Sequence, residues 1–241
     1  MNCHICNSAA NKCFEKLVLS KYEVNYWECP NCGFVFTDTP FWLEESYQSS
    51  IVKTDYGVLS RAIRMRYYAS ALLYFVYGRK SKCLDYGAGY GSFVRGMRDL
   101  NFEFYWYDKY TKNIFANDFD YEENNVSHID FITSFEVFEH VSNPIAEIEK
   151  LLQISRNIFF TTLLIPNPTP QEWWYYGEEH GQHISFYRKK TFEFIARKYS
   201  LNFYSNGEDI HLLTEKKLTW IMQKMLFNSK MVRIIYGLFI R

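Results

Sequence analysis

The sequence predicts an α/β fold with a parallel sheet, preceded by a small metal-binding module. Between residues 82 and 165, short apolar runs alternate with apolar residues at helical spacing, which is typical of the strands and helices of a parallel sheet. Five of the six cysteines lie within the first 32 residues, four of them in two Cys-x-x-Cys pairs. This clustering indicates a metal site rather than a disulfide framework.

The composition limits the class of protein. The 241 residues are 48% hydrophobic and 22% charged, which is enough for one globular core and excludes a disordered chain. Lys and Arg together number 27, as do Asp and Glu, so a uniformly basic footprint for nucleic acid is absent and a nucleic-acid partner is not expected. No apolar stretch approaches the roughly 20 residues that span a bilayer, so we expect a cytoplasmic protein.

The sequence predicts that residues 1–40 form a small independent module. Cys3 and Cys6 form one pair, and Cys29 and Cys32 form the second, 22 residues further on. Four thiolates at this spacing suit one tetrahedral zinc ion, with zinc–sulfur bonds of about 2.3 Å. The second pair, with Gly33 after it, resembles a zinc-ribbon knuckle. A closed site of four cysteines leaves no open position, so we expect structural zinc.

Changes in the spacing of apolar residues divide the rest of the chain into three segments. A linker over 41–60 leads to the main domain over 61–215, and a basic amphipathic C-terminal helix is expected over 216–241. The main domain is expected to begin with a helix that stops at Gly78. Its further elements are expected as strands over 82–86, 102–107, 128–135 and 157–165, helices over 93–100, 144–154 and 191–199, and a hairpin over 202–214.

A glycine-rich turn follows the first strand of the main domain. Asp85 precedes Gly87, Gly89 and Gly91, and the third glycine falls one position early for the dinucleotide fingerprint. The turn also lacks the Gly-Lys-Ser/Thr of a phosphate-binding P-loop. Glycines let the backbone approach a ligand closely, so we expect a side chain at Gly87 to block a cofactor while leaving the fold largely intact.

With Asp85, this turn resembles the first motif of the class I S-adenosyl-L-methionine-dependent methyltransferases. The resemblance covers about residues 61–214 and implies a Rossmann-like sheet with helices on both faces. It also implies that the loop lies against the methionine portion of S-adenosylmethionine. The next strand ends in Asp108, 17 positions beyond Gly91, about where a carboxylate accepts both ribose hydroxyls.

The resemblance implies further cofactor contacts. Lys109 and Tyr110 would flank the adenine, and Asp118 and Phe119 would supply an edge contact and an apolar wall. Phe135 would lie at a strand end beside the cofactor. The implied cofactor-binding residues are Asp85, Gly87, Ala88, Gly89, Gly91, Asp108, Lys109, Tyr110, Asp118, Phe119 and Phe135.

The expected reaction centre follows the strand over 128–135. Residues 136–144 resemble the fourth motif of the family, beside the transferable methyl group, and contain His140. The sequence lacks the Asn-Pro-Pro-Tyr or Asp-Pro-Pro-Tyr of amino-methylating DNA and protein enzymes, and it lacks the Pro-Cys nucleophile of cytosine C5 methylation. The expected reaction is therefore methyl transfer to an oxygen, carbon or ordinary nitrogen of a smaller acceptor.

A loop rich in Pro and aromatic residues follows the last parallel strand and is expected to form a lid. The segment from His183 resembles a pattern found in small-molecule and sugar methyltransferases, and Glu179 with His180 resembles the Glu-His pair of the sugar C-methyltransferases. A base must take the acceptor proton, and histidine suits this near neutral pH. We expect His180 to be the base and Glu179 to orient it, with His140 and His183 as the alternatives.

These observations favour an S-adenosylmethionine-dependent methyltransferase that methylates an oxygen of a sugar, nucleotide-sugar or glycan precursor. The alternatives are a sugar C-methyltransferase, a zinc-ribbon RNA methyltransferase and a non-catalytic scaffold. Residues 216–241 carry six Lys or Arg residues and no acid, interleaved with apolar side chains. This segment is expected to pack on its own domain or a second copy, or to lie on an anionic membrane surface.

Overall fold

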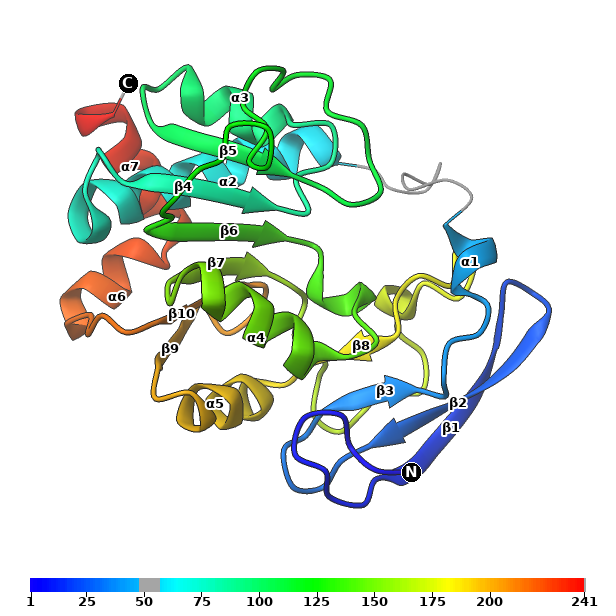
Figure 1. Cartoon of the computed structure of the whole chain (residues 1–241). Helices are drawn as coiled ribbons and strands as arrows, with labels where there is room; N and C mark the ends of the chain where they lie inside the picture. Colours follow the sequence, from blue (N-terminus) through cyan, green and yellow to red (C-terminus); the bar gives the residue numbers. More distant parts are fainter. Residues whose placement is uncertain (48–56, 241) are drawn as a thin grey trace.

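The computed structural model describes residues 1–47 and 57–240, and its main sheet has six strands in the order β5-β4-β6-β7-β10-β9 (Figure 1). The first four are parallel, whereas β10 runs antiparallel to both of its neighbours. The strands are β4 (Lys82–Tyr86), β5 (Glu103–Tyr107), β6 (Phe131–Phe135), β7 (Ile158–Thr161), β9 (Asn202–Ser205) and β10 (Ile210–Thr214). The predicted α/β fold with a Rossmann-like sheet is confirmed.

Helices cover both faces of this sheet, because neighbouring strand residues point to opposite sides. Phe159 packs in the core beneath α2, α3, α6 (Trp220–Leu226) and α7 (Ser229–Phe239), whereas Phe160 packs in the core beneath α4 and α5. The helices of the main domain are α2 (Val58–Leu72), extended by the π-helical turn η1 (Leu73–Tyr77), α3 (Ser92–Arg98), α4 (Pro144–Ile154) and α5 (Lys189–Lys198). Residues 108–130, all of them described, form turns and an isolated bridge instead of a helix.

The N-terminal segment forms a second, antiparallel sheet in the order β1-β2-β3-β8. Its strands are β1 (Asn11–Val18), β2 (Tyr22–Glu28), β3 (Val35–Thr37) and β8 (Ser185–Phe186), and the short helix α1 (Leu43–Ser46) follows β3. Because β8 comes from the segment after the predicted lid, the N-terminal sheet is not the independent module that we expected. Tyr26 and Phe186 share a third core between the sheet and the lid segment.

The C-terminal segment forms two helices, α6 (Trp220–Leu226) and α7 (Ser229–Phe239), and not the single helix that we expected. Asn228 causes the break, because its side chain accepts from the backbone N–H groups of Lys230 and Met231 (both 3.1 Å) and so caps α7. Val232 and Ile235 are buried in the core that includes α2, so the segment packs on its own domain. No helix of the described residues has the length and apolar character needed to cross a membrane.

Candidate active site

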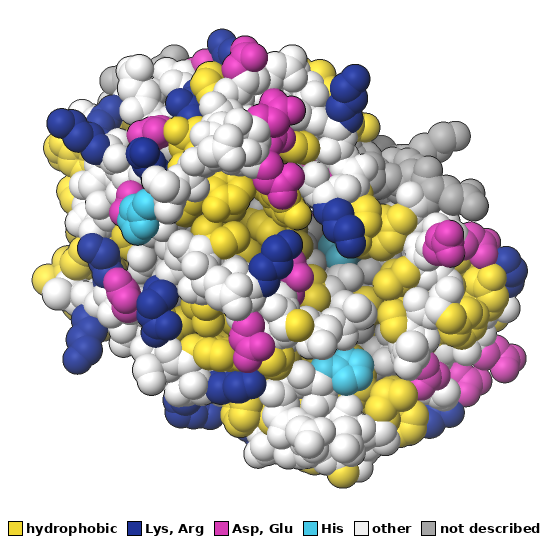
Figure 2. Space-filling view, in the orientation of Figure 1, with side chains coloured by type: hydrophobic (Ala, Val, Ile, Leu, Met, Phe, Trp, Pro, Cys, Tyr) yellow, Lys and Arg dark blue, Asp and Glu magenta, His cyan; other side chains and the backbone are white. Residues whose placement is uncertain are grey.

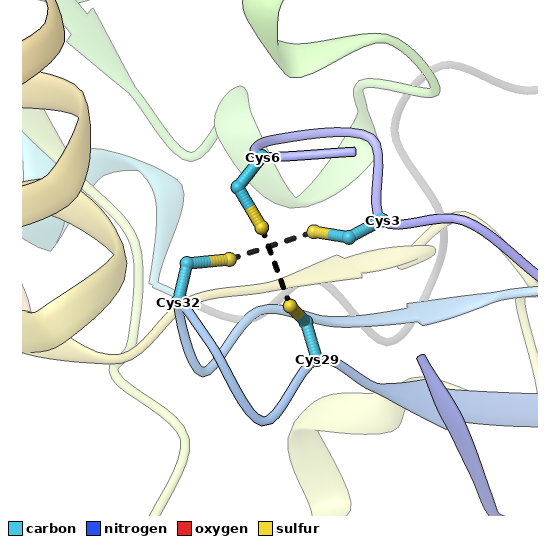
Figure 3. A group of neighbouring side chains, drawn as sticks. All are labelled: Cys3, Cys6, Cys29 and Cys32. Atoms are coloured by element: carbon cyan, nitrogen blue, oxygen red, sulfur yellow. Dashed lines mark hydrogen bonds between the residues drawn. The ribbon is translucent and has the colours of Figure 1, made fainter. Parts of the chain in front are cut away.

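The four predicted cysteine ligands converge at one point between two turns (Figure 3). The Sγ atoms of Cys3 and Cys32 are 3.5 Å apart, and those of Cys6 and Cys29 are 3.4 Å apart. A tetrahedron with zinc–sulfur bonds of about 2.3 Å has sulfur–sulfur edges of about 3.8 Å, so the four sulfurs fit a zinc ion after a small expansion. Cys13 is exposed and lies outside this four-cysteine cluster.

A large cavity of about 1060 Å³ opens at the carboxyl ends of β4, β5 and β6. This is the edge at which open α/β sheets bind ligands. Most of the residues predicted for the site line this cavity. They are Asp85, Gly87, Ala88, Gly89, Asp108, Lys109, Tyr110, Phe135, His140, His180 and His183. Of the other predicted site residues, all of them described, Gly91, Asp118, Phe119 and Glu179 lie outside the lining.

The glycine-rich turn has left-handed backbone conformations at Gly87 (φ +76°) and Gly89 (φ +53°). A Cβ at Gly87 would lie 2.5 Å from a methyl group of Val137, whereas a Cβ at Gly89 would meet no atom within 4 Å. The expectation that a side chain at Gly87 leaves the fold largely intact is therefore wrong, because that side chain would collide with Val137. Its effect on the cofactor stays a prediction. Gly89 is the position at which open space lies beside the backbone.

Asp108 stands at the end of β5 and is fixed by backbone donors. Its Oδ2 accepts from the N–H of Gly89 (2.8 Å), and its Oδ1 accepts from the N–H groups of Tyr110 (2.8 Å) and Thr111 (2.7 Å). These bonds tie the carboxylate to the glycine-rich turn. A carboxylate has about four acceptor positions, so one remains available beyond the three that these bonds use.

Asp85 lies beneath the same turn and is 3% exposed. Thr133 of β6 donates its hydroxyl to Asp85 Oδ1 at 2.6 Å. Burial, together with the negative charge of Asp108, raises the pKa of Asp85 to about 7, while the bond from Thr133 opposes this shift. Asp85 is therefore a buried carboxyl group that titrates near neutral pH.

Residues 109–119 place aromatic side chains differently from our expectation. Tyr110 lines the cavity, but Phe119 does not. The ring of Phe119 packs instead under the guanidinium of Arg98, whose Cζ lies 4.1 Å from the centroid of the ring. The cavity instead gains Tyr90 and Phe115, which the sequence analysis missed. A turn without regular spacing carries no signal for the direction of such side chains.

Glu139 is the main site residue that the sequence analysis missed. It follows β6 in the short turn η2 (Phe138–His140), is completely buried and lines the cavity. Tyr175 donates its hydroxyl to Glu139 Oε1 at 2.7 Å. Burial, followed by the charge of Glu136, raises the pKa of Glu139 to about 8. Acidic residues are common after strands, so its burial was not readable from the sequence.

His140 and His183 lie next to each other, with ring centroids 4.8 Å apart. Nδ1 of His140 contacts the carbonyl of Gln182 (3.2 Å), and Nδ1 of His183 contacts the carbonyl of Tyr175 (2.6 Å). A carbonyl can only accept, so each Nδ1 carries a proton and each neutral ring has its lone pair on Nε2. Burial, with His140 nearby, holds the pKa of His183 well below its usual value.

His180 has the opposite orientation. Its Nδ1 accepts from the backbone N–H of Gln182 at 3.1 Å, so the neutral ring carries its proton on Nε2. Glu179, its expected partner, is exposed. The structure thus brings all three histidines to one cavity but separates them into two tautomers.

The region of α1, which follows the N-terminal sheet, holds the loop that carries these histidines. Trp42 donates its indole N–H to the carbonyl of Gly181 (2.8 Å), and the side chain of Gln182 donates to the carbonyl of Ser46 (2.8 Å). Ile184 donates its N–H to the carbonyl of Glu139 (2.8 Å). The loop is therefore fixed from both sides, by the N-terminal segment and by the turn after β6.

The comparisons with known proteins agree with this architecture. Residues 60–206, more than half of the chain, match the family described as "Methyltransferase domain". A search of the curated proteins found no match.

Several solved methyltransferase structures are similar in fold. Magnesium protoporphyrin IX methyltransferase from Synechocystis PCC 6803 with bound SAM is 12% identical, with 71% of this chain and 89% of that chain covered and a TM-score of 0.42. Plantazolicin methyltransferase BamL, with a triazolic desmethylPZN analogue and SAH, is 13% identical, with 67% and 87% covered and a TM-score of 0.46. Plantazolicin methyltransferase BpumL with SAH is 13% identical, with 76% and 80% covered and a TM-score of 0.47.

Proposed function

The chain belongs to the methyltransferase-domain family, and we propose that it transfers the methyl group of S-adenosylmethionine to a hydroxyl oxygen of a small, sugar-like acceptor. The observation that carries this proposal is the position of His140 and His183. Both line the same cavity as the glycine-rich turn and Asp108, and both have an Nε2 lone pair. A hydroxyl acceptor needs such groups because its proton leaves as the new bond forms.

We place S-adenosylmethionine across the carboxyl ends of β4 and β5. Gly87, Ala88 and Gly89 would lie along its methionine portion, and the open space beside Gly89 supports this placement. Asp108 would accept from the ribose, and Tyr110 with Lys109 would flank the adenine. Phe135 would line the wall near the methyl group. Contacts from Gly91, Asp118 and Phe119 stay predictions, as does the effect of Asp85 on the cofactor.

The chemistry then needs little from the protein beyond alignment and proton removal. The acceptor oxygen attacks the methyl carbon, the carbon–sulfur bond breaks, and the sulfonium becomes a neutral thioether. The hydroxyl proton leaves in the same step. His180 with Glu179 stays our sequence-based prediction for the base, but the tautomer of His140 makes its Nε2 the better proton acceptor. His183 is the weaker base of the pair, because burial holds its pKa well below the usual value.

The rim of the cavity supports the proposal of a sugar-like acceptor. Trp174 is 79% exposed and lines the opening, where its ring could stack on a sugar. Lys and Arg are interspersed with Asp and Glu over the face drawn in Figure 2, which supports a small molecule over a nucleic acid. The structural zinc of the four-cysteine cluster would fix the N-terminal sheet and take no part in the reaction.

The C-terminal helices α6 and α7 expose several large apolar side chains. Trp220, Ile221, Ile234, Leu238 and Phe239 are exposed on α6 and α7 beside the basic residues of this segment. Contact with a second copy or with a membrane surface through these side chains stays a prediction.

The test of the reaction uses S-adenosylmethionine with a ¹³C-labelled methyl group and a panel of sugars and nucleotide-sugars. Carbon NMR separates methyl ethers from methyl groups on nitrogen or carbon. We expect the label in a methyl ether, and much less of it with Asp108→Ala at a cofactor concentration that saturates only the wild type. A label on carbon would favour the sugar C-methyltransferase alternative, and one on nitrogen would exclude both.

A further inference from the structure

We propose that Glu139, His140 and His183 form a binding site for one divalent transition-metal ion, at the acceptor end of the cavity and separate from the four-cysteine cluster. One ring nitrogen of each histidine and one carboxylate oxygen of Glu139 lie within 4.8 Å of one another. A metal ion at their centre would need only small side-chain shifts to reach bonds of about 2.0–2.2 Å.

Glu139 carries the strongest evidence for a bound cation. Its Oε1 accepts from Tyr175, but its Oε2 is buried and has no hydrogen-bond partner among the described residues. A buried carboxyl oxygen without a partner is costly, because it has lost water and gained nothing in return. A metal ion bound to Oε2 removes that cost. Glu136 and Arg61 also line the cavity and act on each other, so Glu139 supplies the negative charge of the site.

The two histidines are oriented as metal ligands usually are. In metal sites the nitrogen that does not bind the ion commonly donates to a backbone carbonyl, which fixes the ring and leaves the other nitrogen unprotonated. Here Nδ1 of His140 donates to the carbonyl of Gln182, and Nδ1 of His183 donates to the carbonyl of Tyr175. Nε2 is therefore the ligand atom of each ring.

The backbone holds the three ligands in place without a metal. Glu139 and His140 come from the turn after β6, whereas His183 comes from the loop before β8. The bond from the N–H of Ile184 to the carbonyl of Glu139 joins these two segments. A site whose ligands are already fixed loses little conformational entropy when the ion binds.

The ligand set indicates the class of metal and its role. Two imidazoles with one carboxylate suit Mn²⁺, Fe²⁺, Co²⁺ or Zn²⁺ better than Mg²⁺ or Ca²⁺, which prefer oxygen ligands. Three protein ligands leave open positions, as in catalytic sites. Resting on the proposed function, we infer that the acceptor hydroxyl occupies one of them. With the ion bound, the Nε2 atoms of His140 and His183 are ligands and no longer proton acceptors. The ion instead lowers the pKa of the hydroxyl, its proton passes to solvent, and the oxygen then attacks the methyl group.

The test uses Mn²⁺ as the probe and the full chain with zinc already bound at the cysteines. Thiolates select zinc over Mn²⁺, so electron paramagnetic resonance of free Mn²⁺ reports the new site alone. We expect one Mn²⁺ per chain. Glu139→Gln keeps an acceptor for Tyr175, and His183→Ala removes a ring; each should weaken Mn²⁺ binding by at least about 10-fold, as loss of a ligand does.

The control is His128→Ala, because His128 is exposed and lies outside the cavity lining. It should bind Mn²⁺ like the wild type. Absence of Mn²⁺ binding to the wild type, or binding that both Glu139→Gln and His183→Ala leave unchanged, would overturn the metal site. Circular dichroism of each variant establishes that it is folded, and His140→Ala replaces any variant that is not.

The outcomes also separate this inference from the proposed function. A methyl ether product without Mn²⁺ binding would overturn the metal site and leave O-methylation in place. Mn²⁺ binding with a methyl group found on nitrogen or carbon would leave the metal site in place and overturn O-methylation.

Discussion

Phe36 of β3 pairs in antiparallel register with Ser185 of β8, two residues after His183. β3 itself begins shortly after Cys32, whose carbonyl accepts from the hydroxyl of Thr191 at the start of α5 (2.9 Å). The four-cysteine cluster is thus connected through one short sheet to the loop that carries His183. Folding of the N-terminal sheet and the geometry of the cavity are therefore coupled.

The first prediction concerns this coupling. Cys29→Ser should remove one equivalent of zinc per chain and lower the melting temperature, because zinc binding supplies much of the folding free energy of such a small sheet. Amide hydrogen exchange should speed up at Ile184, whose N–H bonds to Glu139. Metal analysis, thermal unfolding and exchange measure the three effects.

The matched control is Cys13→Ser, which changes an exposed thiol outside the cluster. It should keep the zinc content and melting temperature of the wild type. Wild-type protein purified without chelator and found free of zinc would refute the structural role of the cluster.

The second prediction concerns Asp108. Asp108→Ala should weaken S-adenosylmethionine binding by about 1.5 to 3 kcal/mol, because the charge-assisted bond from the ribose to the one remaining acceptor position of Asp108 is lost. The three backbone donors that hold Asp108 would also lose their acceptor. Asp108→Asn keeps one oxygen acceptor and should lose less. Calorimetry that finds equal affinity for all three proteins would show that the ribose is bound elsewhere.

The third prediction separates two glycines of the same turn. Gly87→Ala should lower the free energy of unfolding by on the order of 2 to 4 kcal/mol, since its methyl would combine a left-handed backbone with a collision against Val137. Gly89→Ala meets only the backbone strain, about 1 to 2 kcal/mol, but its methyl occupies the open space at the cavity.

Gly89→Ala should therefore be the more stable variant and yet, among folded molecules, the weaker binder of S-adenosylmethionine. Denaturant titration gives the stability, and calorimetry on the folded protein gives the affinity. Full cofactor affinity in Gly89→Ala would mean that the cofactor does not approach this part of the turn.

The parallel strands and the glycine-rich turn were readable from the sequence because their signals are local. The strand over 82–86 matches β4 residue for residue, and Asp108 lies at the cavity as expected. The pairing of β8 with β3 was not readable, because two residues carry no strand pattern of their own and their partner lies far away in the sequence. For the same reason the approach of Glu139 to His183 was missed, although both residues were visible in the sequence.

Local signals were also overlooked. Asn228, followed by Ser229, is a typical N-cap, and it separates α6 from α7 where we expected one helix. The amphipathic pattern continued across this position, so the apolar periodicity concealed the break.

The last prediction concerns Asp85, whose pKa of about 7 in the folded protein lies above the value of about 3.9 in an unfolded chain. Between these values the folded state holds a proton that the unfolded state has released, so its contribution to the free energy of unfolding falls as pH rises from about 4 to about 7 and is level above. Asp85→Asn keeps an acceptor for Thr133 and removes this titration. The wild type should therefore lose stability relative to Asp85→Asn across this range, by at most about 4 kcal/mol in total. Urea titrations of both proteins without cofactor, at half-unit steps of pH, measure the difference, in which the titration of all other groups cancels. Parallel stability curves would show that Asp85 is ionised in the folded protein throughout, and that its charge is stabilised by groups other than Thr133.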